Sequence, residues 1–422
     1  MQELSVLGHV ALGYSPMIDR QRAVAATRLT VFPDHGVAEV DADALLRALD
    51  EVWPPGTETE AIQFNLRPMG RDGTKPGAAS HRPPVCLNIA GEALLQSVMA
   101  AAPCAHRMIE VPAFLAADPA HAQALRGLHD AGVTLLIKGR PLVPLAPELL
   151  ACFTHSIVEA DDERRGVSAS SPGLRQVSTV QAGALTVAEV EAAFQRGAVA
   201  VLGWQSDEVV APPKPGRRAV ANDIQVVLEL ISGVDREEPV SRLEAILKRD
   251  PALAFRLLRY LNSAAFGLTT EINSFAHALM LLGYQKLKRW LTLLLASSSK
   301  DAYAKPLIFA SVRRGLLMEE LGRGNGDAEM RGEMFICGVF SLLDRLLQQP
   351  LDELLASVPV PQRVRQALRA EGGPFLPYLD LVRAIEGESL FDIRECREKL
   401  FMGPAEVNVA LLNALRVARQ ID

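Results

Sequence analysis

The chain has 422 residues, of which 49% are hydrophobic, 22% are charged and 5% are aromatic, and its formal net charge is −6. This length and composition exclude a disordered chain and leave room for two or three globular domains, each with its own core. The negative charge and the few aromatic side chains argue against a nucleic-acid partner, because nucleic acids attract basic surfaces and their unpaired bases stack on aromatic rings.

The start of the chain and its cysteines predict a cytoplasmic protein without a membrane partner. The opening MQELSVLGHV lacks the basic and apolar segments of a secretion signal, and charges interrupt the apolar run LLGYQKLKRWLTLLLA. No CxxC pair occurs among the five cysteines, which are Cys86, Cys104, Cys152, Cys337 and Cys396. We therefore expect neither a disulfide framework nor a structural zinc site.

Residues 1–208 alternate short β-prone runs with helical runs. VCLNIA and VTLLIKG are typical of buried strands, whereas EALLQSVMAAA and TVAEVEAAFQRG are typical of amphipathic helices. This alternation predicts βα units around a parallel sheet. VVAPPKPGRRAV follows at residues 209–220, and its prolines and basic residues predict a solvated linker.

Residues 221–422 show helical patterns almost throughout. The segment KRDPALAFRLLRYLNSAAFGL contains a strong helix start, because Asp250 can accept the free amide protons of a first turn and Pro251 has no amide proton to leave unpaired there. Leucines then recur at helical spacing, as at Leu253, Leu257 and Leu261. The second half is therefore predicted to be an all-helical domain.

This helical half resembles the HDOD family, the non-catalytic relatives of HD phosphohydrolases. The resemblance lies in KRDPALAFRLLRYLNSA, in the following run of the form I-x-S-x-x-x-A-L-x-L-L-G, and in MFICGVFSLLDRLL at residues 334–347. It covers most of residues 215–422. We expect an HD-related helical domain there.

Ahead of such a domain, the first half resembles a degenerate EAL domain, a (β/α)8-barrel class that hydrolyses cyclic di-GMP. GYSPMIDRQRAVAATRLTVF is similar to the first strands of that family, VCLNIAGEALL and MIEVPAFLA to two later strands, and AVAVLGW to the last strand. The resemblance implies an α/β, TIM-like barrel over residues 1–208, followed by the helical HDOD domain over residues 221–422. The barrel is shorter than the roughly 250 residues typical of the fold, so we expect reduced or missing elements.

HD-type phosphohydrolase activity is excluded by the residues present. That reaction needs histidines and aspartates that converge on a metal ion. The second half contains one histidine, His277, which we interpret as structural. The resemblance places Ser341 and Leu342 where the paired His and Asp would stand, and neither can replace them as a ligand.

The EAL reaction, as the resemblance implies it, uses Mg²⁺ or Mn²⁺ held by several carboxylates. Thr27, Arg28 and Leu29 stand where the Glu of the EAL tripeptide would be, and the region of Ile137 and Lys138 replaces a pair of aspartates. A lysine at that place repels a metal cation. We therefore predict no catalytic residue, no bound metal and no cofactor.

Other positions of the resemblance are mixed. Asn88 and Glu110 match ligand positions of the EAL family, and Asp161 keeps an acidic residue two positions after Glu159, which replaces the catalytic lysine. Hydrophobic residues stand where the family has a late glutamate and a glutamine near the substrate, and they are Leu185 and Leu202.

These observations predict a non-catalytic, bacterial-type signalling protein that acts through contacts with unidentified protein partners, with a homodimer left open. Such a barrel could also sense cyclic di-GMP without hydrolysing it, and the candidate ligand-binding residues are then Arg28, Asn88, Glu110, Lys138 and Asp161. The alternative is a divergent phosphodiesterase in which Glu110, Asn88 and Asp161 hold one Mg²⁺ or Mn²⁺ ion.

Overall fold

The structure is a computed structural model of the whole chain. It describes residues 3–34, 40–52, 85–101, 107–139, 141, 144–160, 177–184, 186–203, 222–247, 249, 304–324, 327–357 and 360–418, together with isolated positions between 279 and 295. The chain forms two compact units. The first takes its described residues from 3–52, 85–203 and 383–412, and the second takes them from 222–382 and 413–418.

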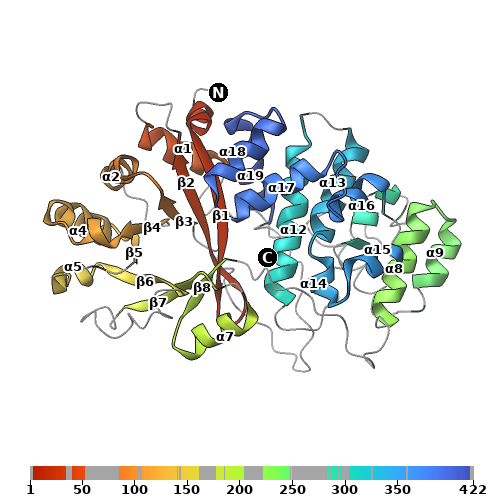
Figure 1. The fold of residues 1–422 in the computed structure, drawn as a ribbon, viewed down its shortest axis with the longest axis horizontal. Coiled ribbons are helices and arrows are strands. Elements are labelled where there is room, and N and C mark those ends of the chain that lie inside the picture. Colours follow the sequence, from red (N-terminus) through yellow and green to blue (C-terminus); the bar gives the residue numbers. More distant parts are fainter. Residues whose placement is uncertain are drawn as a thin grey trace, which may run out of the picture. The chain divides into compact units, whose positions relative to one another are not determined.

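The first unit is built around a closed barrel of eight strands in chain order (Figure 1). The strands are β1 (Val10–Asp19), β2 (Val24–Pro33), β3 (Val85–Ile89), β4 (Arg107–Pro112), β5 (Thr134–Lys138), β6 (Phe153–Glu159), β7 (Ser178–Ala182) and β8 (Ala200–Leu202). Strand β1 runs antiparallel to both of its neighbours, and each pair from β2 to β8 is parallel. The predicted barrel is confirmed. All eight strands are present, and the expected reduction is visible in the three-residue β8.

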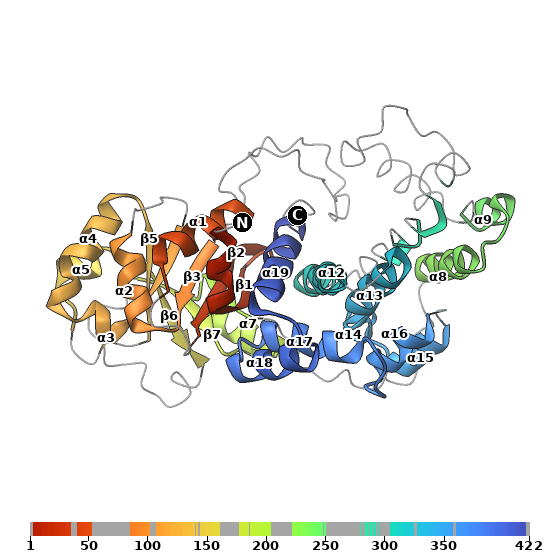
Figure 2. The same cartoon turned by 90° about the horizontal axis from the view of Figure 1, so that it is seen from above.

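Helical segments lie between the strands, and Figures 1 and 2 show α4 and α5 outside the barrel wall. The segments are η1 (Glu3–His9), α1 (Ala42–Val52), α2 (Glu92–Ala100), α3 (Ala113–Ala116), η2 (Pro119–His121), α4 (Ala122–Asp130), α5 (Pro147–Leu150) and α7 (Val187–Gln195). The helices predicted from EALLQSVMAAA and TVAEVEAAFQRG are α2 and α7. Helix α7 begins with a capping box, in which the side chains of Thr186 and Glu189 each accept a bond from the other's backbone amide.

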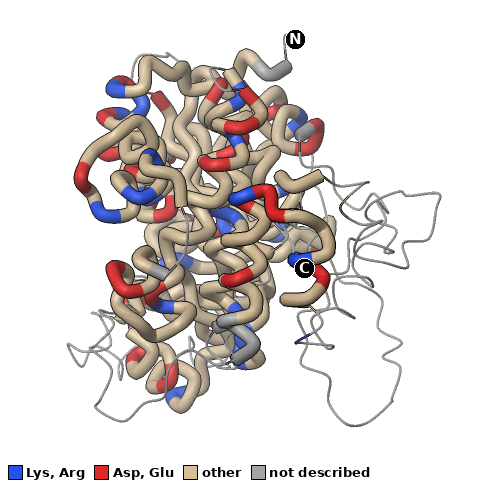
Figure 3. The backbone as a smooth tube through the Cα atoms, turned by 90° about the vertical axis from the view of Figure 1, so that its right-hand side faces the viewer, with Lys and Arg blue, Asp and Glu red and all other residues tan. Residues whose placement is uncertain are grey.

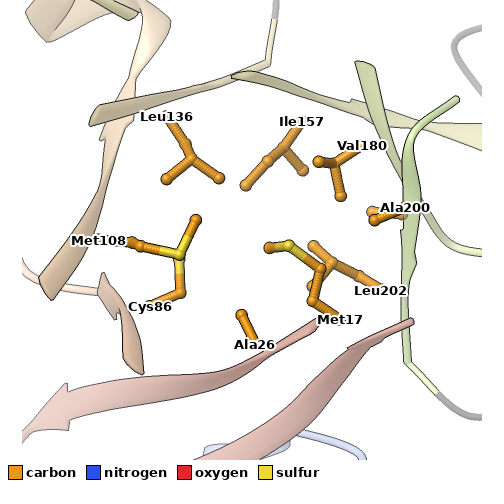
Figure 4. Close-up of a cluster of buried hydrophobic side chains, with 10 residues drawn as sticks. Met17, Ala26, Cys86, Met108, Leu136, Ile157, Val180, Ala200 and Leu202 are labelled. Carbon is orange, nitrogen blue, oxygen red and sulfur yellow. The ribbon is translucent and has the colours of Figure 1, made fainter. Parts of the chain in front are cut away.

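The interior of the barrel contains an apolar layer, drawn in Figure 4. Each strand contributes side chains that alternate between the inside and the outside, so residues two positions apart share the interior. The layer consists of Met17, Ala26, Cys86, Met108, Leu136, Ile157, Val180, Ala182, Ala200 and Leu202. These side chains fill the barrel, which is a packed core at this level and not a channel.

Residues 383–412 belong to the barrel unit, although the sequence analysis placed them with the helical domain. They comprise the end of α17 (Leu376–Glu386), α18 (Leu390–Lys399) and most of α19 (Pro404–Ala418), and Figures 1 and 2 show α19 beside β1. The Asn408 side chain donates to the carbonyl oxygens of Leu7 and Val10, both at 2.8 Å, and accepts from the amide of Leu12 at 3.1 Å.

The short β8 explains why this C-terminal segment packs there. Of the residues of β1, only 17–19 pair with β8. Backbone groups earlier in β1 therefore need another partner, because an unpaired buried amide or carbonyl is costly. Asn408 supplies that partner, and the ion pair between Arg394 and Asp34, at 2.8 Å, adds a second connection. Neither contact has a local signal in the sequence.

Every regular element among the described residues of the second unit is a helix, which confirms the predicted fold class of the second half. Its helices are α8 (Asn222–Asp235), α9 (Val240–Leu247), α12 (Ala304–Leu321), α13 (Ala328–Phe340), α14 (Leu343–Leu347), α15 (Leu351–Ser357), α16 (Gln362–Leu368) and most of α17. Helices α12 and α13 approach closely at Gly338, where a Cβ atom would lie 2.5 Å from the backbone of Arg314. The linker at 209–220, the helix start at Asp250 and His277 lie outside the described residues.

Charged residues of both signs are interspersed along the described chain (Figure 3). The cysteines Cys86, Cys152, Cys337 and Cys396 form no disulfide bond, and Cys104 lies outside the described residues. Within the described ranges, none of the helices combines the length and the apolar character that a membrane crossing requires.

Candidate functional site

A polar layer lies directly above the apolar layer, toward the carboxyl-terminal rim of the parallel strands. It follows from the two-residue alternation of the strands: Arg28 comes two residues after Ala26, Asn88 after Cys86, Glu110 after Met108 and Lys138 after Leu136. Four of the five predicted candidates therefore meet in the barrel. The fifth, Asp161, lies outside the described residues.

Arg28 and Glu110 form the centre of this layer. Arg28 donates from Nε to Oε1 of Glu110 at 2.6 Å and from Nη2 to Oε2 at 2.8 Å. The pair is bidentate and buried, because Arg28 is 8% exposed and Glu110 is 1% exposed. Burial by itself lowers the pKa of Arg28, but the carboxylates of Glu110 and Glu388 outweigh that effect and raise the pKa above its usual value. Arg28 is therefore a permanent cation.

A chain of hydrogen bonds joins the other two candidates to the same layer. Lys138 donates from Nζ to Oδ1 of Asn88 at 3.1 Å, and Asn88 donates from Nδ2 to Oγ1 of Thr30 at 3.0 Å. Asn88 and Thr30 are buried. The amide of Asn88 is thus oriented by a cation on one side and by a hydroxyl group on the other.

Glu388 is the site residue that the sequence analysis missed. It follows α17, and its carboxylate accepts from Nη1 of Arg28 at 2.7 Å, from Oγ1 of Thr30 at 2.6 Å and from Oγ of Ser15 at 3.2 Å. Its side chain is 18% exposed. Arg28 and Glu388 are 360 residues apart in the chain, so no pattern within one segment could have predicted the contact.

The link between α17 and α18, residues 387–389, approaches β1 very closely. Gly13 makes this possible, because a Cβ atom there would lie 3.2 Å from Cα and Cγ of Glu388 and from the carbonyl oxygen of Ile385. Glu388 itself has a φ angle of 51°, in the left-handed region that a side chain rarely adopts. The Tyr14 hydroxyl donates to Glu386 at 3.2 Å beside the link. The link is therefore seated in a defined conformation.

The remaining predicted positions are distributed differently. By strand alternation, Thr27, Leu29 and Ile137 lie on the opposite face from Arg28 and Lys138. Of the three residues aligned with the EAL tripeptide, only Arg28 therefore enters the polar layer. Leu202 belongs to the apolar layer and Glu159 is exposed at the end of β6. Leu185 lies outside the described residues.

The described residues do not fit the divalent metal ion that the EAL resemblance implies. Both oxygens of Glu110 accept bonds from Arg28, and Oδ1 of Asn88 accepts from the ammonium group of Lys138. A metal ion at Glu110 would have to displace a guanidinium group and remain beside that positive charge. Among the residues that the structure describes, no cluster of three or more His, Cys, Asp or Glu side chains could hold a metal.

Cys86 lies beside Glu110 and donates from Sγ to Oε1 at 3.5 Å. Burial raises the pKa of the Cys86 thiol well above its usual value, and the negative charge of Glu110 raises it further. The thiol is therefore neutral, and we expect it to be chemically inert.

Ser341 and Leu342, which stand in place of the HD pair, have packing roles in the second unit. The Ser341 hydroxyl donates to the carbonyl oxygen of Gly338 at 2.7 Å and accepts from Nη1 of Arg314 at 3.0 Å. Leu342 is buried. Ser341 is the C-cap of α13, and Leu342 directly precedes α14.

Comparison with known proteins identifies the helical part. The family model described as HDOD domain matches residues 221–350. The chain is 33% identical over 168 residues to the uncharacterized protein YuxH of Bacillus subtilis (strain 168), a match that covers 38% of this chain and 40% of YuxH. It is 28% identical over 207 residues to the cyclic di-GMP phosphodiesterase CdgJ of Vibrio cholerae serotype O1, covering 49% and 48% of the two chains. The chain thus spans less than half the length of these relatives.

Solved structures are also similar to this chain. The PaMucR phosphodiesterase in complex with cyclic di-GMP has a TM-score of 0.32 at 18% identity, and the match covers 49% of this chain and 97% of that one. The Bacillus subtilis YkuI protein, with an EAL domain in complex with cyclic di-GMP and calcium, has a TM-score of 0.30 at 9% identity, covering 66% and 74%. The chain thus joins a closed eight-stranded barrel to a helical part in which residues 221–350 match the HDOD domain, as the sequence predicted.

Proposed function

We propose that this chain is a non-catalytic protein of cyclic di-GMP signalling, whose barrel does not hydrolyse the nucleotide. One observation carries the proposal: Arg28 forms a buried, bidentate ion pair with Glu110, the carboxylate that the EAL resemblance places at a metal-ligand position. Metal-assisted hydrolysis depends on a cation that lowers the pKa of a bound water molecule. The guanidinium group occupies that carboxylate and cannot activate water in the same way.

The connection with cyclic di-GMP comes from a relative and from the sequence resemblance. CdgJ, which matches about half of this chain, is named a cyclic di-GMP phosphodiesterase. The polar layer of this chain retains the groups that bind an anionic nucleotide without a metal, because Arg28 and Lys138 are both cationic donors. We therefore propose that any response to cyclic di-GMP is binding without hydrolysis, and that the output is a contact with a protein partner.

A hydrolysis assay tests this proposal. The full chain is incubated with cyclic di-GMP and either Mg²⁺ or Mn²⁺, and the products are separated by chromatography. We expect no turnover above a buffer blank with either metal. Turnover that disappears in a folded Glu110→Gln variant would overturn the proposal.

The second candidate function is a divergent phosphodiesterase with a reduced metal site. It is favoured by two oxygen-bearing residues that remain in the polar layer, Asn88 and Glu110, and by the name of CdgJ. Asp161, its proposed third ligand, lies outside the described residues. In this case Arg28 must release Glu110 when the metal binds, so activity would require a high metal concentration and would rise when Arg28 is replaced by methionine.

The protein partner and the oligomeric state remain predictions. A signalling role through protein contacts needs a surface on the barrel, on the HDOD domain or on both, and homodimers are the commonest oligomers of soluble proteins. Light scattering of the full chain during size-exclusion chromatography measures the oligomeric state directly. We expect a defined monomer or dimer, and we expect its mass to be independent of added metal.

A further inference from the structure

The charges of the polar layer are balanced only because the C-terminal segment contributes one of them. Among its described members, Arg28 and Lys138 are positive, and Glu110 and Glu388 are negative. Arg28, Lys138 and Glu110 belong to barrel strands, whereas Glu388 belongs to the link between α17 and α18. Without Glu388, the three charged residues that the barrel strands contribute to this layer would carry a net positive charge.

The donors that hold Glu388 are those that would hold a phosphate group. The carboxylate accepts from the guanidinium of Arg28 and from the hydroxyl groups of Thr30 and Ser15, at 2.7, 2.6 and 3.2 Å. A phosphodiester oxygen is also an anionic acceptor, and guanidinium and hydroxyl groups are its common partners in proteins. The carboxylate of Glu388 thus accepts hydrogen bonds from groups that could equally bind the phosphate group of a ligand.

Removal of Glu388 from this place would leave the rest of the layer intact. Arg28 binds Glu110 through Nε and Nη2, and Glu388 through Nη1. Arg28 would therefore keep its buried counter-ion and its orientation when Nη1 is released. Glu388 is also the partly exposed member of the group, at 18% for its side chain, whereas Glu110 is 1% exposed. Solvent can thus reach the acid that would have to leave, but not the one that stays.

The backbone of the link is held in an unfavourable conformation. The left-handed φ angle of 51° at Glu388 costs a residue with a side chain about 1 kcal/mol or more, and here the ionic and hydrogen bonds of the carboxylate offset that cost. A strained residue held by such bonds is a natural point at which a segment can be released.

We propose that Glu388 closes the barrel in cis: its carboxylate occupies a phosphate-binding position formed by Arg28, Thr30 and Ser15, and a phosphodiester ligand binds only by displacing the α17–α18 link. This deepens the proposed function, because it assigns the regulation of the same non-hydrolysing site. It also couples ligand binding to α18, whose Arg394 pairs with Asp34 after β2, and to α19, whose Asn408 bonds to β1. Displacement of the link therefore changes the surface that these helices present.

Titration calorimetry of full-length variants with cyclic di-GMP tests this closure. Glu388→Gln removes the charge and keeps the shape, and Glu388→Gly removes the side chain and suits the left-handed backbone, so it protects the fold. An internal group that competes for the site lowers the apparent affinity. The apparent association constant is the intrinsic one multiplied by the fraction of molecules in which the site is open. We expect both variants to bind cyclic di-GMP at least about tenfold more tightly than the unaltered chain.

Glu395→Gln is the matched control, because it removes the same charge from the same C-terminal segment. Glu395 is an exposed acid of α18 that pairs with Lys399. We expect it to bind like the unaltered chain. Equal affinity of the unaltered chain and both Glu388 variants, or binding by none of them, would overturn the closure. The proposed function fails separately, if chromatography of the titrated samples shows hydrolysed nucleotide.

Discussion

The two interior layers of the barrel are built on the same strands, two residues apart, yet their chemistry is opposite. Ala26, Cys86 and Leu136 belong to an apolar layer in which side chains fill space. Arg28, Asn88 and Lys138 belong to the polar layer above it, where each side chain has a directed hydrogen bond. The apolar layer would tolerate other apolar side chains of similar total volume, whereas the polar layer depends on hydrogen bonds between particular atoms.

This difference indicates which layer carries information about function. Replacing a buried ion pair by apolar residues of similar volume is often neutral or stabilising, so stability alone does not account for Arg28 and Glu110. The proposed function gives the pair a different reason, because a guanidinium group at this carboxylate favours the binding of an anion over the binding of a metal ion. The following predictions test the contrast between the layers, from the largest expected effect to the smallest.

The largest effect is expected from breaking the ion pair on one side. Arg28→Met leaves the buried carboxylate of Glu110 without its counter-ion and should lower the free energy of unfolding by about 3–5 kcal/mol. Urea unfolding followed by circular dichroism measures this loss. The double variant Arg28→Met, Glu110→Leu should recover most of it, and a double variant as unstable as the single one would contradict the account.

A cavity in the apolar layer should destabilise the barrel without touching the ligand site. Leu136→Ala removes a fully buried side chain and should cost about 3 kcal/mol in the same unfolding experiment. In the Glu388→Gly background it should leave the affinity for cyclic di-GMP unchanged, as long as the chain is folded. A change of more than about tenfold, or roughly 1.4 kcal/mol, would show that the two layers are not independent.

Thr30 connects Glu388 to Asn88, so its hydroxyl should matter more than that of Ser15. Thr30→Val removes the bond to Glu388 at 2.6 Å and the bond from Asn88 at 3.0 Å, and should cost about 1–2 kcal/mol. Ser15→Ala removes only a 3.2 Å bond to Glu388 and should cost less. The two urea midpoints measured side by side decide this order.

The smallest effect is expected outside both layers, at His155 on β6. Burial lowers the pKa of His155 below its usual value of 6.5. The unfolded chain then binds the proton more readily, so the free energy of unfolding falls as the pH drops from about 6.5 through the lowered pKa. His155→Gln should reduce the difference between the urea midpoints at pH 7.5 and pH 5.5, and an unchanged difference would contradict this prediction.

Much of the fold and part of the site can be predicted from the sequence. Periodicity and Gly, Pro and capping residues are local signals, and they predict elements such as β3, α2 and α7. The candidates Arg28, Asn88, Glu110 and Lys138 came instead from the resemblance to the EAL family. Their meeting in one layer agrees with the fold, because parallel strands bring residues near their carboxyl-terminal ends to one rim.

The position of Glu388 could not be predicted in this way. Its contact depends on the packing of the C-terminal helices against the edge of β1 that the short β8 leaves unpaired. The left-handed backbone at Glu388 is also hidden in the sequence, because Gly387, which would suit such an angle, stands one position earlier. Long-range packing thus determined the residue that completes the site.

The central claim is that Arg28 has replaced the metal ion at Glu110. Electron paramagnetic resonance of free Mn²⁺, measured while the ion is titrated into the full chain, tests it most directly. The account predicts that all added Mn²⁺ stays free at concentrations well above that of the protein. One tightly bound Mn²⁺ per chain, lost in a folded Glu110→Gln variant, would contradict it.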